Sequence, residues 1–391
     1  MRDEEVTMKG EVPARAVGIY VHVPFCISKC AYCDFVSYPY NNEDVASYAE
    51  ALEQEIRLRG KECDQENVVK SVYLGGGTPT CLPPATLKRI LSLLREHFVI
   101  SPEAEITVEA NPGTVTDELL EGLLSSGVNR LSIGMQSTED AMLQVLGRRH
   151  TAADAVKTIQ ITRRAGFTNI SVDLIFGIPG QSTGGWGRSL AEIVALGPEH
   201  ISTYGLEIHG ETPLGRAVAA GKTAVCSDEV FQAMYFQAVD YLNAAGYVQY
   251  EISNFARPGR ESRHNLLYWE GEPYLGLGPG AHSYLNRRRW ANAAELDTYR
   301  NALFGGGFPV AEETNLTPAD EMAETMFLGL RLTRGVSALR FRERFGREPE
   351  AVYGLEISRL IARGLLRREN GRLRLTREAL PVANQVFAAF V

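Results

Sequence analysis

Three cysteines stand close together near the start of the sequence, at Cys26, Cys30 and Cys33. They directly follow an apolar run, residues 18–23, which predicts a strand that ends in a thiolate-bearing loop. Iron–sulfur clusters are held by cysteine thiolates, normally one for each iron. Three thiolates on a four-iron cluster leave one iron without a protein ligand, so that iron can bind a small molecule that reacts.

Two other readings of these cysteines are weaker. A structural zinc site needs a fourth ligand, commonly from a second CxxC or an HxxxH pair. The sequence has neither, and Cys63, Cys81 and Cys226 are scattered. Three buried core thiols are the other alternative, but Lys29 and the residues around it are unlike a core segment. The spacing therefore favours an iron–sulfur cluster.

The complete signature, CxxxCxYC with Tyr32 before the last cysteine, resembles that of the radical S-adenosylmethionine (radical SAM) superfamily. In that superfamily the open iron takes the amino and carboxylate groups of S-adenosylmethionine. The resemblance therefore implies two cofactors: a [4Fe-4S] cluster on Cys26, Cys30 and Cys33, and S-adenosylmethionine bound to it.

Composition excludes several classes of protein. The 391 residues carry a formal net charge of -8, which argues against a nucleic-acid surface. No apolar run approaches the ~20 residues that span a bilayer. Residues 1–16 mix both signs of charge without an apolar segment, so we expect no signal peptide. The cysteine pattern is no disulfide framework and suits a reducing compartment, so we expect a cytoplasmic protein.

Strand-like and helical patterns alternate through the first half of the chain. Glycines that typically end helices, Gly127, Gly166 and Gly197, are each followed within a few residues by a β-rich run. We count six such units between residue 18 and about residue 208. This predicts an α/β fold with a parallel sheet, in the form of a partial, open (β/α)6 barrel. The radical SAM resemblance implies the same barrel.

The sequence predicts three parts along the chain. Residues 1–17 are expected to be a disordered tail, and residues 18–303 the barrel with an extension. A glycine-rich linker, residues 304–308, precedes a helical domain over residues 312–391. Asn370-Gly371 between two short alternating runs signals a hairpin, so we expect a winged-helix-like domain. The acidic balance of the chain favours a structural or partner role for it over DNA binding.

Active sites of parallel barrels lie at the carboxyl ends of the strands, so polar residues there are candidates. Glycines 75–77 precede Thr78 and allow close backbone approach to a ligand; a plain turn needs fewer. Arg148 offers a planar fork to a carboxylate. Any one of the acceptors could be a helix cap, but together they predict a site for ribose hydroxyls and an ammonium group. These acceptors are Glu109, Gln136 and Asp173.

Further segments narrow the resemblance. IYVHVPFC, GGGTPT, EANP, GMQS, LGRRH, DLIFGIPG and YEISNF are similar to the branch that contains oxygen-independent coproporphyrinogen III oxidase and the haem chaperone HemW. The resemblance implies that Tyr20, Gly76 and Glu109 contact the S-adenosylmethionine on the cluster. Positions that hold a second S-adenosylmethionine in the oxidase match Gly77, Thr78, Gln136, Arg148 and Asp173.

Two features distinguish the members of this branch. The oxidase has a further cysteine two residues after the third, where this chain has Phe35, and it has a longer N-terminal extension. Conversely, residues 264–269, HNLLYW, resemble the HNxxYW motif of HemW proteins. Chemistry alone favours a core histidine at His264, whereas the resemblance implies a haem axial ligand with aromatic neighbours.

The resulting prediction is a haem chaperone that binds the cluster, S-adenosylmethionine and haem, and passes haem to a client protein such as a membrane respiratory enzyme. The alternative is an oxygen-independent coproporphyrinogen III oxidase, which would decarboxylate two propionates by radical chemistry. A radical enzyme acting on another substrate is the third hypothesis. All three use the same cofactors, the chemistry being that of the cofactor.

Overall fold

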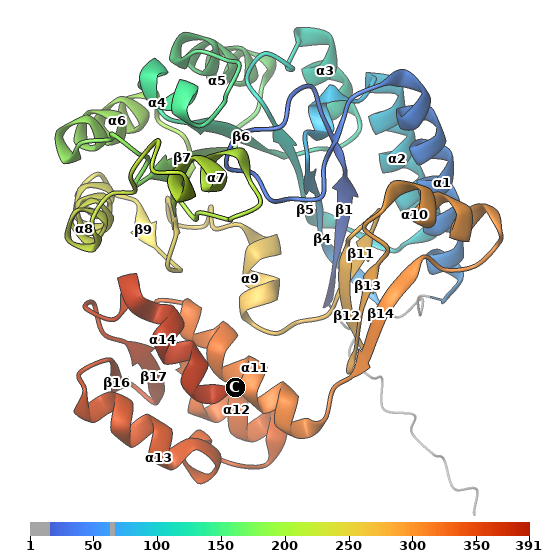
Figure 1. The fold of residues 1–391 in the computed structure, drawn as a ribbon. Helices are drawn as coiled ribbons and strands as arrows, with labels where there is room; N and C mark the ends of the chain where they lie inside the picture. Colours follow the sequence, from blue (N-terminus) through green and yellow to red (C-terminus); the bar gives the residue numbers. More distant parts are fainter. Residues whose placement is uncertain (1–15, 63–66) are drawn as a thin grey trace, which may run out of the picture.

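The computed structural model of the chain describes residues 16–62 and 67–391. Its main feature is a curved 12-stranded sheet, in the order β14-β13-β12-β11-β1-β4-β5-β6-β7-β8-β10-β9 (Figure 1). The six central strands pair in parallel, which confirms the predicted open (β/α)6 barrel. They are β1 (Ala16–Val23), β4 (Val68–Gly76), β5 (Ile100–Ala110), β6 (Arg130–Gln136), β7 (Ile170–Phe176) and β8 (His200–Gly205).

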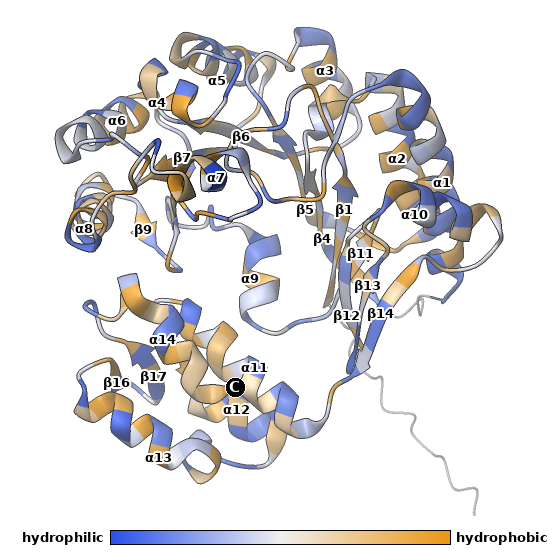
Figure 2. Cartoon of the chain, in the orientation of Figure 1, coloured by the Kyte–Doolittle hydropathy of each residue, from blue (hydrophilic) through white to orange (hydrophobic). Residues whose placement is uncertain are grey.

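Helices cover the outer side of the parallel strands (Figure 1). They carry both apolar and polar residues (Figure 2), because one face packs on the sheet and the other meets water. In α2, for example, Leu87, Ile90 and Leu94 are buried at helical spacing. The helices of this region are α1 (Asn42–Glu62), α2 (Pro84–His97), α3 (Asp117–Ser125), α4 (Asp140–Val145), α5 (Ala152–Ala165), α6 (Thr183–Leu196), α7 (Pro213–Ala219) and α8 (Asp228–Ala244), with a 3-10 turn η1 (Pro79–Cys81).

The extension adds strands to both edges of the barrel. After α9 (Arg263–Trp269), which packs on β1 and β4, strand β11 (Tyr274–Leu277) pairs in parallel with β1. The antiparallel strands β12 (His282–Leu285), β13 (Arg288–Asn292) and β14 (Val310–Asn315) follow, with α10 (Leu296–Phe304) packed on α1. The opposite edge ends in β10 (Asn254–Ala256) and β9 (Val248–Gln249).

The boundary with the last domain lies later than predicted. Residues 305–307 form the turn between α10 and β14, and β14 pairs with β13. Residues 312–315, which the sequence assigned to the C-terminal domain, therefore belong to the large sheet. The strand escaped prediction because it is a charged, exposed edge strand without apolar alternation.

The C-terminal domain has its own apolar core, which includes Met326, Leu330 and Phe341. Asn370 and Gly371 both have positive φ and form the predicted hairpin turn. The order helix, strand, two helices and two strands is that of a winged helix. The elements are α11 (Pro318–Arg331), β15 (Val336–Ser337), α12 (Ala338–Phe345), α13 (Pro349–Ala362), β16 (Leu366–Glu369) and β17 (Arg372–Leu375), followed by η2 (Leu380–Val382), α14 (Ala383–Phe387) and η3 (Ala388–Phe390).

Two further predictions from the sequence concern the N-terminal tail and membrane-spanning segments. Residues 1–15 of the predicted disordered tail lie outside the described residues, whereas Ala16 and Val17 begin β1. Across residues 16–62 and 67–391, none of the helices combines the length and the apolar character that a membrane crossing requires.

Candidate functional site

The three cysteines lie on the loop between β1 and α1, residues 24–40, which we call the cluster loop. Its base is closed by two short parallel strands, β2 (Phe25–Cys26) and β3 (Tyr38–Pro39). Cys26, Cys30 and Cys33 all line one cavity of about 460 Å³ at the carboxyl ends of the barrel strands. The predicted thiolate-bearing loop therefore faces the inside of the barrel.

Backbone hydrogen bonds hold the middle of the cluster loop from both sides. The Ala31 amide donates to the Leu146 carbonyl at 2.9 Å, and the Ala31 carbonyl accepts from the Leu214 amide at 2.8 Å. Gly147 makes this approach possible: its φ is +70°, and a Cβ there would lie 2.9 Å from the Ala31 nitrogen. The segment LGRRH therefore serves first as a backbone support for the cysteines.

A line of side-chain hydrogen bonds connects the barrel to the first cysteine. Arg148 Nη1 donates to Asn111 Oδ1 at 2.8 Å, and Asn111 Nδ2 donates to Thr78 Oγ1 at 2.7 Å. Thr78 Oγ1 lies 3.5 Å from Cys26 Sγ. Arg148 Nη2 also donates to the Tyr32 hydroxyl at 2.8 Å, so the arginine contacts the cluster loop directly. The loop is thereby fixed to the ends of β4 and β5 and to the segment after α4.

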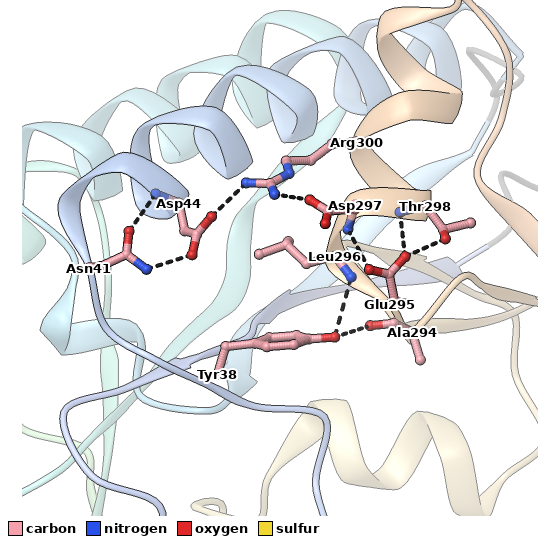
Figure 3. A network of polar contacts seen from close by, with 9 residues as sticks. All are labelled: Tyr38, Asn41, Asp44, Ala294, Glu295, Leu296, Asp297, Thr298 and Arg300. Atoms are coloured by element: carbon pink, nitrogen blue, oxygen red, sulfur yellow. Dashed lines mark hydrogen bonds and ion pairs between the residues drawn. The ribbon is translucent and has the colours of Figure 1, made fainter.

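The far end of the cluster loop is anchored to the extension (Figure 3). The Tyr38 hydroxyl donates to the Ala294 carbonyl at 3.0 Å and accepts from the Leu296 amide at 3.2 Å. Arg300 lies one turn further along α10, and its Nη1 is 2.9 Å from a carboxylate oxygen of Asp44 on α1. The extension therefore supports the cluster loop as well as widening the sheet.

Two carboxylates face the first cavity from neighbouring strand ends. Glu109 accepts from the Tyr73 hydroxyl at 2.7 Å and from the Gly76 amide at 3.2 Å, and burial raises its pKa to about 7. Asp173 accepts from Ser202 Oγ at 2.6 Å and from Ser132 Oγ at 3.2 Å, and burial raises its pKa as well. An ammonium ligand placed beside them would favour their charged forms and lower both pKa values again.

Two strand ends beside the carboxylates have unusual backbone. Gln136, which lines the cavity, has a φ of +68° where the pairing of β6 with β7 is irregular. A left-handed residue other than glycine is strained, and such strain is concentrated at functional sites. Gly76 has a φ of +105°, and a Cβ there would lie 2.5 Å from the His22 ring. Residue 76 is therefore restricted to glycine because His22, on the neighbouring strand β1, leaves no room for a side chain.

The structure brings most of the predicted site residues together and leaves two aside. Tyr20 lines a second cavity, of about 570 Å³, that borders the first. His264 lines neither cavity. The first cavity is lined by Cys26, Cys30, Cys33, Gly76, Gly77, Thr78, Glu109, Gln136, Arg148 and Asp173.

His264 is only 1% exposed, and both of its ring nitrogens have partners. Nδ1 lies 2.8 Å from Ser71 Oγ, and Nε2 lies 2.8 Å from the Tyr268 hydroxyl. Burial lowers its pKa to about 3, so the ring is neutral. The geometry is that of a buried, hydrogen-bonded histidine, and ligation of haem iron would require one of these bonds to break.

Comparison with known proteins identifies the family. The Radical SAM superfamily model matches residues 20–190, and the HemN C-terminal domain model matches residues 316–382. The protein named heme chaperone HemW from Bacillus subtilis is 37% identical, with 95% of this chain and 98% of that protein covered. HemW from Mycobacterium tuberculosis is also 37% identical, over 96% and 95%. The chain belongs to the HemW family.

The fold is also that of a solved radical SAM enzyme, coproporphyrinogen III oxidase (HemN) from Escherichia coli. The two superpose with a TM-score of 0.85 over 97% of this chain and 91% of that one, at 23% identity. Membership of a radical SAM family implies a [4Fe-4S] cluster and S-adenosylmethionine for this chain.

The donor set fits such a cluster. Cysteine binds iron as the thiolate. Burial raises the pKa of the Cys26 and Cys33 thiols, so both would lose their protons when the cluster binds. Among the residues that the structure describes, no three His, Cys, Asp or Glu side chains converge as a single ion would require. A cluster makes a different demand, because each thiolate binds a separate iron. Three thiols spread along one cavity wall meet that demand.

Several residues that line the first cavity were not predicted. Asn111, Ser132 and Tyr204 are among them, and Tyr73 holds Glu109. Strand alternation could have identified Ser132, because every second residue of a strand faces the same side and Gln136, four residues later in β6, was already a candidate. Asn111 carried no such signal, because its role depends on Arg148 and Thr78, which are distant in the sequence.

Proposed function

We propose that this HemW-family chain is a haem chaperone, which binds haem beside a [4Fe-4S] cluster and S-adenosylmethionine and delivers it to a client protein. The main support is the 37% identity over nearly the whole chain to a relative named heme chaperone. Haem enters the proposal through the name of these relatives, so haem binding has to be measured on this chain.

A second observation separates the proposal from the oxidase alternative. The residue two places after Cys33 is Phe35, which is 62% exposed and lines both cavities. The resemblance places a cysteine there in the oxidase. An apolar ring in that position offers a contact surface to a flat ligand and supplies no thiol.

The residues of the first cavity have separable roles in this proposal. Cys26, Cys30 and Cys33 would hold the cluster, and Glu109 would accept the ammonium group of S-adenosylmethionine. Asp173, which two serine hydroxyls orient, would accept from ribose hydroxyls. When bound, the cluster supplies one-electron reductive chemistry. The chain contributes positioning, a cavity and carboxylates whose charge the ligand restores.

A client protein and a location complete the proposal. The client would be a haem-accepting protein, such as a membrane respiratory enzyme. A cytoplasmic location is part of the proposal, because the three cluster cysteines must stay reduced until the cluster is assembled.

The decisive experiment compares haem binding with oxidase activity on one preparation. Anaerobically reconstituted protein is titrated with haem and followed by its Soret absorption. The same protein is incubated with coproporphyrinogen III, S-adenosylmethionine and a low-potential reductant. We expect saturable haem binding and no decarboxylated product. Turnover of coproporphyrinogen without haem binding would establish the oxidase function instead.

A further inference from the structure

The second cavity has the aromatic lining that a site for a flat aromatic ligand needs. It lies between the extension, α9 and α11 of the C-terminal domain, and it borders the first cavity at Gly76 and Glu109. Aromatic walls bury large planar ligands at little entropic cost. The aromatic side chains that line it are Tyr20, Phe35, Tyr268, Trp269, Tyr274 and Tyr284.

One histidine in this cavity is free to bind a metal. His282, at the start of β12, is exposed and lines the cavity. Within the described residues, its ring takes part in no hydrogen bond or ion pair. The ring nitrogens of His22, His200 and His264 are all engaged, and His209 pairs with Asp34. His282 therefore offers the unoccupied imidazole nitrogen that an axial ligand needs.

Arginines line a hollow beside the second cavity. A hollow of about 800 Å³ joins the second cavity at Gly271 and Glu272 and is lined by Arg287, Arg344 and Arg347. Arg344 Nη2 lies 3.1 Å from the hydroxyl of Tyr284, an aromatic wall residue of the cavity. Arg347 is exposed and has no ion pair among the residues described. Arginine forks are suited to carboxylates.

Glu321 also lines this hollow and pairs with Arg287 at 2.9 Å and with Arg344 at 3.1 Å, so Arg347 is the arginine there that has no ion pair among the described residues. Two acidic residues of the second cavity are paired in the same way. Glu324 is paired with Arg289 at 2.9 Å, and Glu272 with Arg340 at 3.2 Å. The second cavity and the hollow beside it thus combine aromatic surface, one free imidazole and one arginine without an ion pair, Arg347.

From this geometry we propose that haem occupies the second cavity with His282 as an iron ligand and its propionates toward Arg347. The assignment rests on the proposed haem-chaperone function and names its site. The motif HNLLYW then contributes Tyr268 and Trp269 to the cavity wall. His264 is a positioning residue, because its ring holds the Tyr268 hydroxyl at 2.8 Å.

The test uses the full chain with its cluster reconstituted, titrated with haem and followed by Soret absorption. His282→Ala should shift the Soret band and weaken haem binding by at least about tenfold, since loss of even an outer-shell partner of a metal ligand costs that much. Added imidazole should restore the band. Arg347→Glu should weaken binding with the band unchanged. His97→Ala is the matched control, because His97 ends α2 and lines neither cavity.

The outcomes separate the two proposals. Wild-type affinity and spectrum in His282→Ala would overturn the site while leaving the chaperone function intact. Loss of the histidine signature in His264→Ala, with His282→Ala unaffected, would also overturn the site and assign the iron to His264. Failure of the unaltered chain to bind haem would overturn the proposed function itself.

Discussion

Gly147→Ala should destabilise the protein and reduce its iron content, although Gly147 has no side chain that could bind the cluster. A left-handed backbone costs an L-residue about 1–2 kcal/mol. The new Cβ would stand 2.9 Å from the Ala31 nitrogen, so the cluster loop must move and its hydrogen bond to Leu146 lengthens. That bond is worth a further 0.5–1.5 kcal/mol, roughly. We therefore expect a total loss of about 1.5–3.5 kcal/mol.

Gly113→Ala is the matched control for this experiment. Gly113 also has a positive φ, +88°, but a Cβ there would meet nothing within 4 Å. It should show the backbone cost alone, about 1–2 kcal/mol, and keep its iron. Chemical unfolding of the cluster-free proteins measures the free energies, and iron analysis after anaerobic reconstitution measures cluster occupancy.

The comparison of the two variants tests whether close packing supports the cluster loop. We expect Gly147→Ala to lose more stability than Gly113→Ala and to bind less iron. Equal destabilisation of the two variants, with equal iron content, would refute the reasoning, because the contact with Ala31 would then have no energetic weight.

Three further predictions concern single residues. Cys30→Ser should lose the thiolate-to-iron absorption after reconstitution, and a normal cluster in this variant would contradict the assignment. Burial raises the Glu109 pKa from 4.5 to about 7, so the folded state gains stability from its protonated form, and that stability is lost as the pH rises from about 4.5 to about 7. Denaturant unfolding across this pH window should show that the free energy of unfolding changes less with pH in Glu109→Gln than in the unaltered protein. Parallel pH profiles for the two proteins would contradict the raised pKa of Glu109. His264→Ala leaves the hydroxyls of Ser71 and Tyr268 without their partner, at about 1–3 kcal/mol each. A lowered midpoint of thermal unfolding with the cluster retained is expected, and an unchanged midpoint would exclude the packed role.

The parallel barrel was predictable because its signals are local. Strands such as β6 are buried on both faces, and helices such as α5 show an apolar face and end at a glycine, Gly166. The edge strands were not predictable to the same degree. Strand β14 has no apolar alternation, and β11 owes its place to pairing with β1, which lies far away in the sequence.

The site shows the same division between local and distant information. Cys26, Cys30 and Cys33 lie within one loop, so their spacing alone indicates their chemistry. Asn111 became visible only through its contacts with Arg148 and Thr78. The position of His264 also depends on distant residues.

The ring of His264 bonds Ser71 on β4, and it fits above Gly18 of β1, where a Cβ would lie 3.3 Å from the ring. Sequence analysis could name the HNLLYW motif, but it could not tell which of its side chains reaches a cavity.

The anchoring of the cluster loop to α10 has a consequence for synthesis. Tyr38 and its partner Ala294 are 256 residues apart in the sequence, and β11, which covers the free edge of β1, is nearly as far away. At roughly 5–20 residues per second, the ribosome needs about 10–50 s to make the intervening chain. During that time the nascent barrel has an unpaired strand edge beside its three thiols. Cluster assembly and oxidation of those thiols therefore compete from the moment the loop emerges, and the elements that close the site, β11 and α10, are translated only after all six barrel strands.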